Sequence, residues 1–201
     1  MIATSEGTGG KQFQLPKTGL FPAIFCRLED LGTQTSTWDG QEKSQHKIRI
    51  VWELPTQKAV FKEGNPPEPF VVSSTYTLGL GGKYSLRRDI EGYLGRTLTE
   101  KEAKSFDLNA LIGKTCMVSL KASTGKDGKD YVNISGVNPP MDGVQVPNPS
   151  VESWIWDMGK PDWAVFAKLG KYTREKIAKS PEFSKLEIPP AAAALLGEVA
   201  F

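Results

Sequence analysis

Apolar and polar residues alternate most regularly over residues 46–54, HKIRIVWEL. Every second position there is apolar, at Ile48, Ile50 and Trp52. This period of two is typical of a β-strand with one face in a hydrophobic core, and it places Lys47 and Arg49 on the opposite face. Pro55 follows directly. We expect it to end the strand, because proline cannot donate a hydrogen bond to a neighbouring strand.

Four further segments are predicted to be strands, because each is rich in β-branched, aromatic or other apolar residues and is bounded by turn-forming residues; they are 20–31, 70–80, 114–122 and 130–137. The polar stretch 32–45 is expected to be a loop with a turn at Asp39-Gly40, and the proline-rich stretch 56–69 a second loop. The last two strands should form a hairpin, with its turn in the loop Ser123 to Lys129.

The period changes between the third and fourth strands. Apolar residues recur there at every fourth position, at Leu86, Ile90 and Leu94. A helix with one apolar side is therefore predicted over 84–94. Thr99 and Glu102 have the spacing of a capping box, which indicates the start of a second helical stretch at 100–105.

Changes of composition divide the chain into three parts. Residues 1–17 are rich in glycine and polar residues and are expected to be a flexible N-terminus. Residues 18–140 hold all the predicted strands and form the main domain, which ends at two consecutive prolines. Residues 141–201 are predicted to be a linker and a C-terminal helical tail, with 162–179 helical in two pieces about Gly170.

Charge and cysteine content restrict the class of protein. The 201 residues carry a net charge of only +2. Residues 11–141 hold 18 Lys and Arg against 14 Asp and Glu, whereas residues 142–201 hold 7 against 8. The positive excess therefore lies in the main domain. Cys26 and Cys116 each lie in an apolar run and are expected to be buried thiols in a cytoplasmic protein. The sequence has no apolar run of the length that crosses a membrane, so no membrane partner is expected.

Three strands, a helix and two more strands form the connectivity of the OB-fold. We therefore expect a mainly β protein: a five-stranded OB-fold barrel with a helical insertion between strands 3 and 4, and a C-terminal helical extension. Such barrels bind oligonucleotides or oligosaccharides across strands 2 and 3, between the loops that join strands 1 to 2 and 4 to 5.

The sequence also resembles bacteriophage single-stranded DNA-binding proteins of the OB-fold type. The matching segments keep their order along the chain and are 31–54, 70–91, 106–120, 131–139 and 174–183. The resemblance implies binding of single-stranded DNA with low sequence specificity, in phage DNA replication or recombination, in the cytoplasm of an infected bacterial cell. It implies no catalysis, cofactor or metal. Phage or host replication and recombination proteins are the expected further partners, and a homo-oligomer is left open. Many such proteins end in an acidic tail closed by phenylalanine; here Phe201 is present, but Glu198 is the one acidic residue beside it.

A sequence-tolerant single-strand binder needs cations that follow the phosphates and aromatic faces on which bases stack. The candidate residues come from the second and third strands, the flanking loops and the helix side; they are Trp38, Lys43, Lys47, Arg49, Tyr76, Lys83, Arg87, Arg88, Lys121, Lys126, Lys129 and Tyr131. Each also has an ordinary structural interpretation. Trp38 could pack against the tail, Tyr76 could face the core, and the arginine pair could form a solvated helix face. Trp154, Trp156 and Trp163 are expected to hold the tail to the barrel or to another subunit.

Two other functions compete with DNA binding. The near-neutral charge favours a protein-interaction adaptor of a phage replication complex, in which the Trp-rich tail docks a partner. A nuclease that uses scattered carboxylates is the weaker alternative. One histidine, His46, and two distant cysteines cannot build a common structural zinc site.

Overall fold

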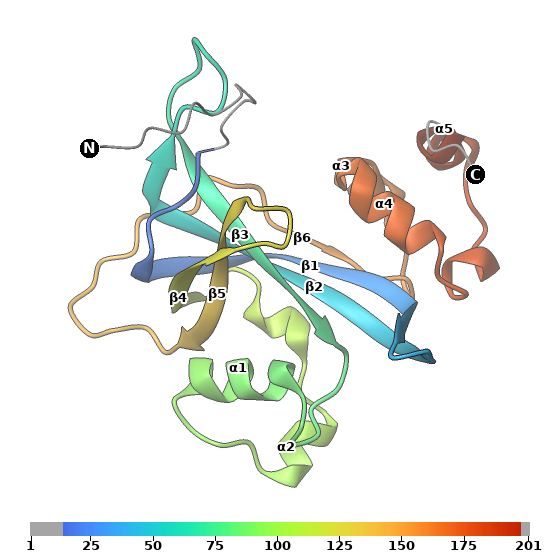
Figure 1. Ribbon diagram of the computed structural model, residues 1–201, viewed down its shortest axis with the longest axis horizontal. Coiled ribbons are helices and arrows are strands. Elements are labelled where there is room, and N and C mark those ends of the chain that lie inside the picture. Colours follow the sequence, from blue (N-terminus) through green and yellow to red (C-terminus); the bar gives the residue numbers. More distant parts are fainter. Residues whose placement is uncertain (1–13, 198–201) are drawn as a thin grey trace, which may run out of the picture.

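A computed structural model describes residues 14–197, without the side chain of Trp38. Five antiparallel strands lie in the order β3-β2-β1-β4-β5 (Figure 1), and a sixth, β6, pairs in parallel with β1. Their bounds are β1 Gly19–Trp38, β2 Gln41–Ala59, β3 Glu68–Thr77, β4 Thr115–Thr124, β5 Asp130–Asn138 and β6 Trp154–Trp156. The fold is mainly β, as expected, but the three-residue strand β6 was missed because so short a segment has no period.

The sheet curls around one hydrophobic core without closing. β3 and β5, at the two ends of the strand order, approach each other but do not pair. The residues that alternate on β2 face inward, since Ile48, Ile50 and Trp52 are all buried in this core. The prediction of Trp52 as a packing residue is confirmed, with 1% of its surface exposed. Cys26 and Cys116 are buried free thiols, and burial raises the pKa of the Cys26 thiol to about 11.

The segment 32–45 was predicted to be a loop, and this prediction is wrong. β1 and β2 run through it as a paired hairpin, here called the arm (residues 33–46), with Thr33 opposite His46 and Trp38 opposite Gln41. The turn at Asp39-Gly40 is confirmed, with φ of 51° and 73°, as a two-residue hairpin turn requires. The arm is polar on both faces, so no alternation of apolar residues could reveal its strands.

Pro55 does not end β2, which continues to Ala59. The pairing with β3 shifts between Leu54 and Lys58, so Pro55 lies in an irregularity where no partner requires its missing N–H. The second loop is correspondingly shorter than 56–69. β3 begins at Glu68 and ends at Thr77 instead of Leu80.

The helices between β3 and β4 agree with the sequence. α1 (Ser85–Leu94) lies below the strands in Figure 1 and inserts Leu86 and Ile90 into the core. α2 (Glu100–Lys104) begins with the predicted capping box of Thr99 and Glu102. A short 3-10 helix, η1 (Leu108–Leu111), then leads to β4.

Replacing Glu102 with Gln should change how stability depends on pH. Hydrogen bonds from the Arg96 side chain and from Thr99 lower the pKa of Glu102 from 4.5 to about 2. A lowered folded-state pKa stabilises the protein above the unfolded value, and this contribution disappears as the pH falls. The difference in free energy of unfolding between wild type and E102Q should therefore be constant above about pH 5 and shrink towards pH 2. Urea titrations across this range measure it, and a difference that persists unchanged at pH 2 would contradict the assignment.

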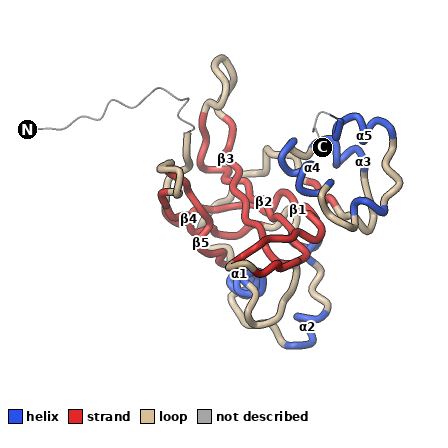
Figure 2. Tube along the Cα trace, turned by 45° about the vertical axis from the view of Figure 1, so that its right-hand side comes forward, coloured by secondary structure: helices blue, strands red, loops and turns tan. Residues whose placement is uncertain are grey.

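The tail forms a second cluster of buried side chains beside the first. Figure 2 shows its helices gathered to one side of the strands; they are α3 (Trp163–Lys168), α4 (Lys171–Ala178), the 3-10 helix η2 (Phe183–Lys185) and α5 (Pro190–Gly197). The predicted division about Gly170 is confirmed. Trp156 and Phe166 are central to this cluster, which also receives Leu31 from β1. None of the helices within residues 14–197 has the length and apolar character needed to cross a bilayer.

Candidate nucleic-acid interface

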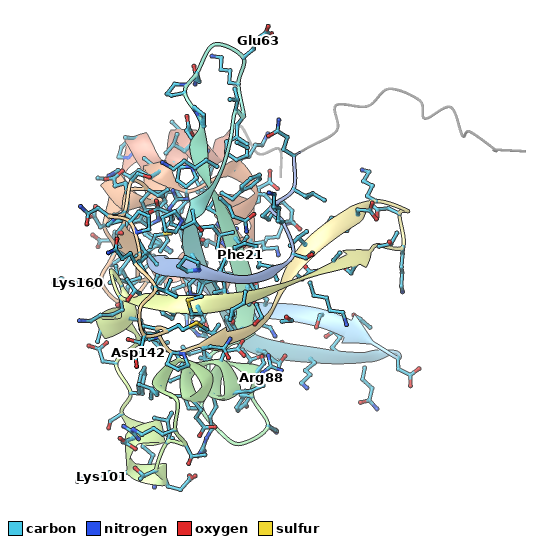
Figure 3. All side chains as sticks on the ribbon, turned by 90° about the vertical axis from the view of Figure 1, so that its left-hand side faces the viewer. Phe21, Glu63, Arg88, Lys101, Asp142 and Lys160 are labelled. Atoms are coloured by element: carbon cyan, nitrogen blue, oxygen red, sulfur yellow. The ribbon has the colours of Figure 1, made fainter. Side chains whose placement is uncertain are left out.

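The outward side of β2 and β3 is polar. Because alternate residues point outward, the register places Lys47 opposite Thr77 and Arg49 opposite Thr75; the polar stretch ends there, because the next outward residue, Val51, is apolar and 4% exposed. We call this surface, with Lys43 on the arm, the polar sheet face. β3 pairs with β2 on one side and approaches β5 on the other, and it ends at Thr77, opposite the residue that follows the arm. The two hairpins project to the same side of the molecule in Figure 3.

Lys47 is a half-buried cation on this face. Its Nζ donates to Gln45 Oε1 at 3.0 Å and to Thr77 Oγ1 at 2.8 Å, and no carboxylate of the described residues forms an ion pair with it. Burial, and then repulsion from Lys43, lower the pKa of Lys47. A phosphate oxygen would supply the counter-charge that this ammonium group lacks among the described residues.

Arg49 differs from Lys47, because its charge is already paired. Its guanidinium donates through Nε and Nη2 to Glu29 Oε2, each at 2.6 Å. Glu29 is 1% exposed, so burial raises its pKa, and the adjacent Arg49 opposes this rise. Because this ion pair already neutralises a buried carboxylate, we expect Arg49 to contribute less to a phosphate contact than an unpaired cation would.

Two other candidates are bonded to other residues of the protein, and one of them, Tyr76, is buried. Tyr76 is 2% exposed and donates its hydroxyl to Asp89 at 2.8 Å, and burial raises its pKa. The prediction that Tyr76 stacks on a base is therefore wrong. Arg87 donates to Glu91, to Glu100 and to the carbonyls of Leu80 and Leu98, and so joins α1 to the loops around it. These contacts give Arg87 a structural role, and its predicted contact with DNA stays a prediction.

The β4–β5 hairpin carries four candidates, and three remain exposed as cations: Lys121, Lys126 and Lys129. Lys129 lies 3.8 Å from Asp127, whereas no ion pair is formed by Lys121 or Lys126 within residues 14–197. Tyr131 is 43% exposed and donates its hydroxyl to Asp127 at 2.8 Å. This hydrogen bond holds the Tyr131 ring against the turn of the β4–β5 hairpin.

The remaining candidates do not join this surface directly. Arg88 is exposed on α1 and pairs with Asp89 at 2.9 Å (Figure 3). Lys83 lies in the turn before α1, where its Nζ is 5.7 Å from the centre of the Tyr84 ring. Trp38 ends β1 at the tip of the arm, but its side chain lies outside what the structure describes, as do residue Phe201 and the N-terminal residues 1–13.

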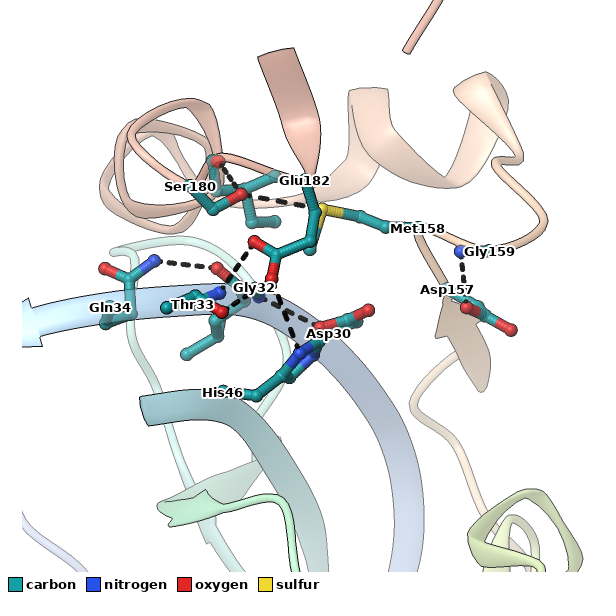
Figure 4. A network of polar contacts seen from close by, with 12 residues as sticks. Asp30, Gly32, Thr33, Gln34, His46, Asp157, Met158, Gly159, Ser180 and Glu182 are labelled. Atoms are coloured by element: carbon teal, nitrogen blue, oxygen red, sulfur yellow. Dashed lines mark hydrogen bonds and ion pairs between the residues drawn. The ribbon is translucent and has the colours of Figure 1, made fainter. Parts of the chain in front are cut away.

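The tail is hydrogen-bonded to the base of the arm (Figure 4), and the sequence did not predict this contact. The Glu182 carboxylate accepts hydrogen bonds from Thr33 N at 2.9 Å and from Thr33 Oγ1 at 2.5 Å. His46 lies between two acids, with Nε2 2.6 Å from Asp30 and Nδ1 3.7 Å from Glu182. These partners are up to 149 residues apart in the chain, so no local pattern reveals them.

The tail is also fixed at the other end of the sheet face. Glu53 on β2 is fully buried, and its carboxylate accepts hydrogen bonds from Ser150 N, Ser150 Oγ and Val151 N. Arg27 stacks on Trp154, with its guanidinium carbon 3.8 Å from the ring centre. Trp154, through Arg27, and Trp156, in β6 beside β1, therefore hold the tail to the strands, as one of the two sequence alternatives predicted, whereas Trp163 packs on Trp156 and Phe166 within the tail.

An open groove of about 900 Å³ adjoins the polar sheet face. β3 contributes Val71 and Ser73 to its lining, and Val132 of β5 and the chain around Ser150 line other parts. Val71 and Phe61 are exposed apolar side chains in it, at 44% and 53%. The groove therefore places apolar surface beside the hydroxyls of β3.

No protein-family model matches the sequence, and a search of curated proteins finds no match. Among the described residues, no three His, Cys, Asp or Glu side chains are grouped so that they could hold a metal ion.

Proposed function

We propose that this protein binds single-stranded DNA with low sequence specificity, without catalysis, and that strands β1–β5 are an OB-fold barrel. The order β3-β2-β1-β4-β5 is that of an OB barrel interrupted between its third and fifth strands, and α1 lies in the connection from β3 to β4. In this fold the ligand crosses strands 2 and 3 between the two flanking loops. The polar sheet face occupies that position.

The observation that carries the proposal is the arrangement of Lys43 and Lys47. Both lie on the outward side of β2, and neither forms an ion pair with a described carboxylate. Lys121 and Lys126 extend the same unpaired charge onto the second hairpin. An extended polyanion fits such separated cations, because each phosphate that meets a lysine releases condensed counterions.

The neighbouring groove supports contacts to bases. Within it, Phe61 and Val71 offer apolar surface and Ser73 offers a hydroxyl, and Thr75 lies beside it on β3. These four side chains lack the planar pair of donors that reads one base; Arg27 and Gln14 also line the groove, and the Arg27 guanidinium is stacked on Trp154. Low sequence specificity follows, consistent with a protein that covers exposed strands during phage replication or recombination.

A salt-dependent titration tests the proposal. The full chain is titrated against fluorescently labelled oligo-dT, with duplex DNA and oligo-U as competitors, and binding is followed by fluorescence polarisation. We expect affinity for oligo-dT to fall steeply with salt, by about 0.7 in the log–log slope for each phosphate contacted. Failure to bind oligo-dT at low salt, or tighter binding of the duplex, would overturn it.

The 900 Å³ groove favours one second candidate, a protein-interaction adaptor. Exposed Phe61 is of a residue type that is enriched at protein interfaces, and the near-neutral charge is compatible with a protein partner. This function would be selected if the protein binds no nucleic acid but forms a stable complex with a co-expressed replication protein, and if Phe61→Asp disrupts that complex.

A further inference from the structure

The solvent face of α4 is basic and carries an exposed aromatic ring. At 100° per residue, one side of this helix presents Lys171, Tyr172, Glu175, Lys176 and Lys179, whereas Thr173, Arg174 and Ile177 are buried on the other side. Tyr172 is 67% exposed, the most exposed of the large hydrophobic side chains in the described part of the chain. The Nζ of Lys176 lies 4.9 Å from the centre of its ring.

The face keeps an excess of positive charge, because its three lysines outnumber Glu175. Within residues 14–197, no ion pair is formed by Lys171, Lys176 or Lys179. Acidic residues of the tail are engaged elsewhere: Asp162 caps α3, and Glu152 pairs with Lys168. The slight negative charge counted for the tail therefore hides a local positive surface.

A short series of contacts joins α4 to the polar sheet face. Gln34 Nε2 on the arm donates to the Lys176 carbonyl at 3.0 Å. Gln34 lies directly opposite Gln45, and Gln45 Oε1 accepts from Lys47 Nζ at 3.0 Å. The backbone of α4 is thus connected through two glutamines to Lys47, the cation on which the proposed function depends. Figure 1 shows α4 beside the β1–β2 arm.

We infer that the bound DNA strand continues from the polar sheet face across the edge of β1 onto α4, where Tyr172 stacks on a base and Lys171, Lys176 and Lys179 contact phosphates. The inference rests on the proposed function and adds a second contact surface to it. An exposed tyrosine flanked by lysines supplies what single-strand binding requires, a flat face for stacking and cations for the backbone. The tail is then part of the binding path as well as a brace for the arm.

The test measures the affinity of the full-length protein for oligo-dT of increasing length. Wild type is compared with three variants: Tyr172→Ala, Tyr172→Phe and Lys171→Ala/Lys179→Ala. With long oligo-dT, Y172A should weaken binding about tenfold and leave the salt slope unchanged, because stacking involves no counterion release. Y172F keeps the ring and should bind within about twofold of wild type. The double lysine variant should lower the salt slope by about 1.4. Oligonucleotides just long enough to cover the sheet face should bind all variants equally.

Lys101→Ala/Lys104→Ala on α2 is the matched control, since it removes the same charge from an exposed helix far from the arm and should match wild type. The inference is overturned if wild type binds long oligo-dT and both the Tyr172 and the Lys171/Lys179 variants match it at every length. Loss of affinity in Y172A and Y172F alike would also exclude stacking. Absence of binding by wild type would instead overturn the proposed function, and this inference with it.

Discussion

Lys43→Ala/Lys47→Ala is expected to weaken binding of oligo-dT by about a hundredfold at low salt. Each lysine would lose a charge-assisted contact to a phosphate, which contributes about 1.5 kcal/mol, and two such losses amount to two factors of ten. The slope of log affinity against log salt should fall by about 1.4, since two fewer counterions are released. Fluorescence polarisation over a series of salt concentrations measures both quantities.

The structure dictates the choice of these two lysines. Arg49 lies beside them, but removing it would leave the buried Glu29 carboxylate without its partner and destabilise the fold. Lys43 is exposed and Lys47 bonds only to neutral oxygens, so their loss should leave the free energy of unfolding within about 0.5 kcal/mol. The Lys101→Ala/Lys104→Ala variant again serves as the control of equal charge. An unchanged salt slope in the Lys43/Lys47 variant would show that DNA does not cross the polar sheet face.

Phe166→Ala is expected to destabilise the tail by about 3–5 kcal/mol, as truncation of a fully buried phenylalanine usually does. Phe166 has no exposed surface, and its ring centre lies 5.0 Å from that of Trp156 and 5.5 Å from those of Trp163 and Phe183. The loss removes the ring around which the other three pack. Urea unfolding followed by tryptophan fluorescence measures it, because Trp156 and Trp163 report directly on this cluster.

Phe61→Ala is the matched control for this variant. It removes the same side chain from a position that is 53% exposed, and it should cost less than about 1 kcal/mol. Equal destabilisation by the two variants would contradict the central role of Phe166. Because Glu182 in the tail holds Thr33 at the base of the arm, F166A should also increase hydrogen exchange in the arm, whereas F61A should not.

The tail and the arm therefore depend on each other. Gly32, at the base of the arm, has φ of 67°, and a Cβ at this position would lie 2.5 Å from the side chain of Ser180. The tail approaches β1 so closely that only glycine fits between them. The contacts of Glu182 with Thr33 (Figure 4) and of Gln34 with the Lys176 carbonyl then join two consecutive residues of the arm to the tail. The arm, which carries part of the proposed binding surface, is therefore positioned by a segment that lies more than 130 residues away in sequence.

The sequence by itself determined the elements whose signals are local. The inward residues of β2, the amphipathic helix α1, the capping box of Thr99 and Glu102, and the Asp39-Gly40 turn were all predicted correctly. Each of these depends on residues within a few positions of one another, so periodicity and capping preferences reveal them.

Only the tertiary structure decided which candidate side chains face solvent with an unpaired charge. Lys47 and Arg49 look equivalent on one strand, yet Glu29, 20 residues away, pairs with Arg49 and not with Lys47. Tyr76 turned inward to meet Asp89, and the polar arm became a strand because its partner strand and the tail supplied hydrogen bonds. Contacts between residues far apart in the chain leave no period in the sequence, and they decide which charges on this surface remain for a ligand.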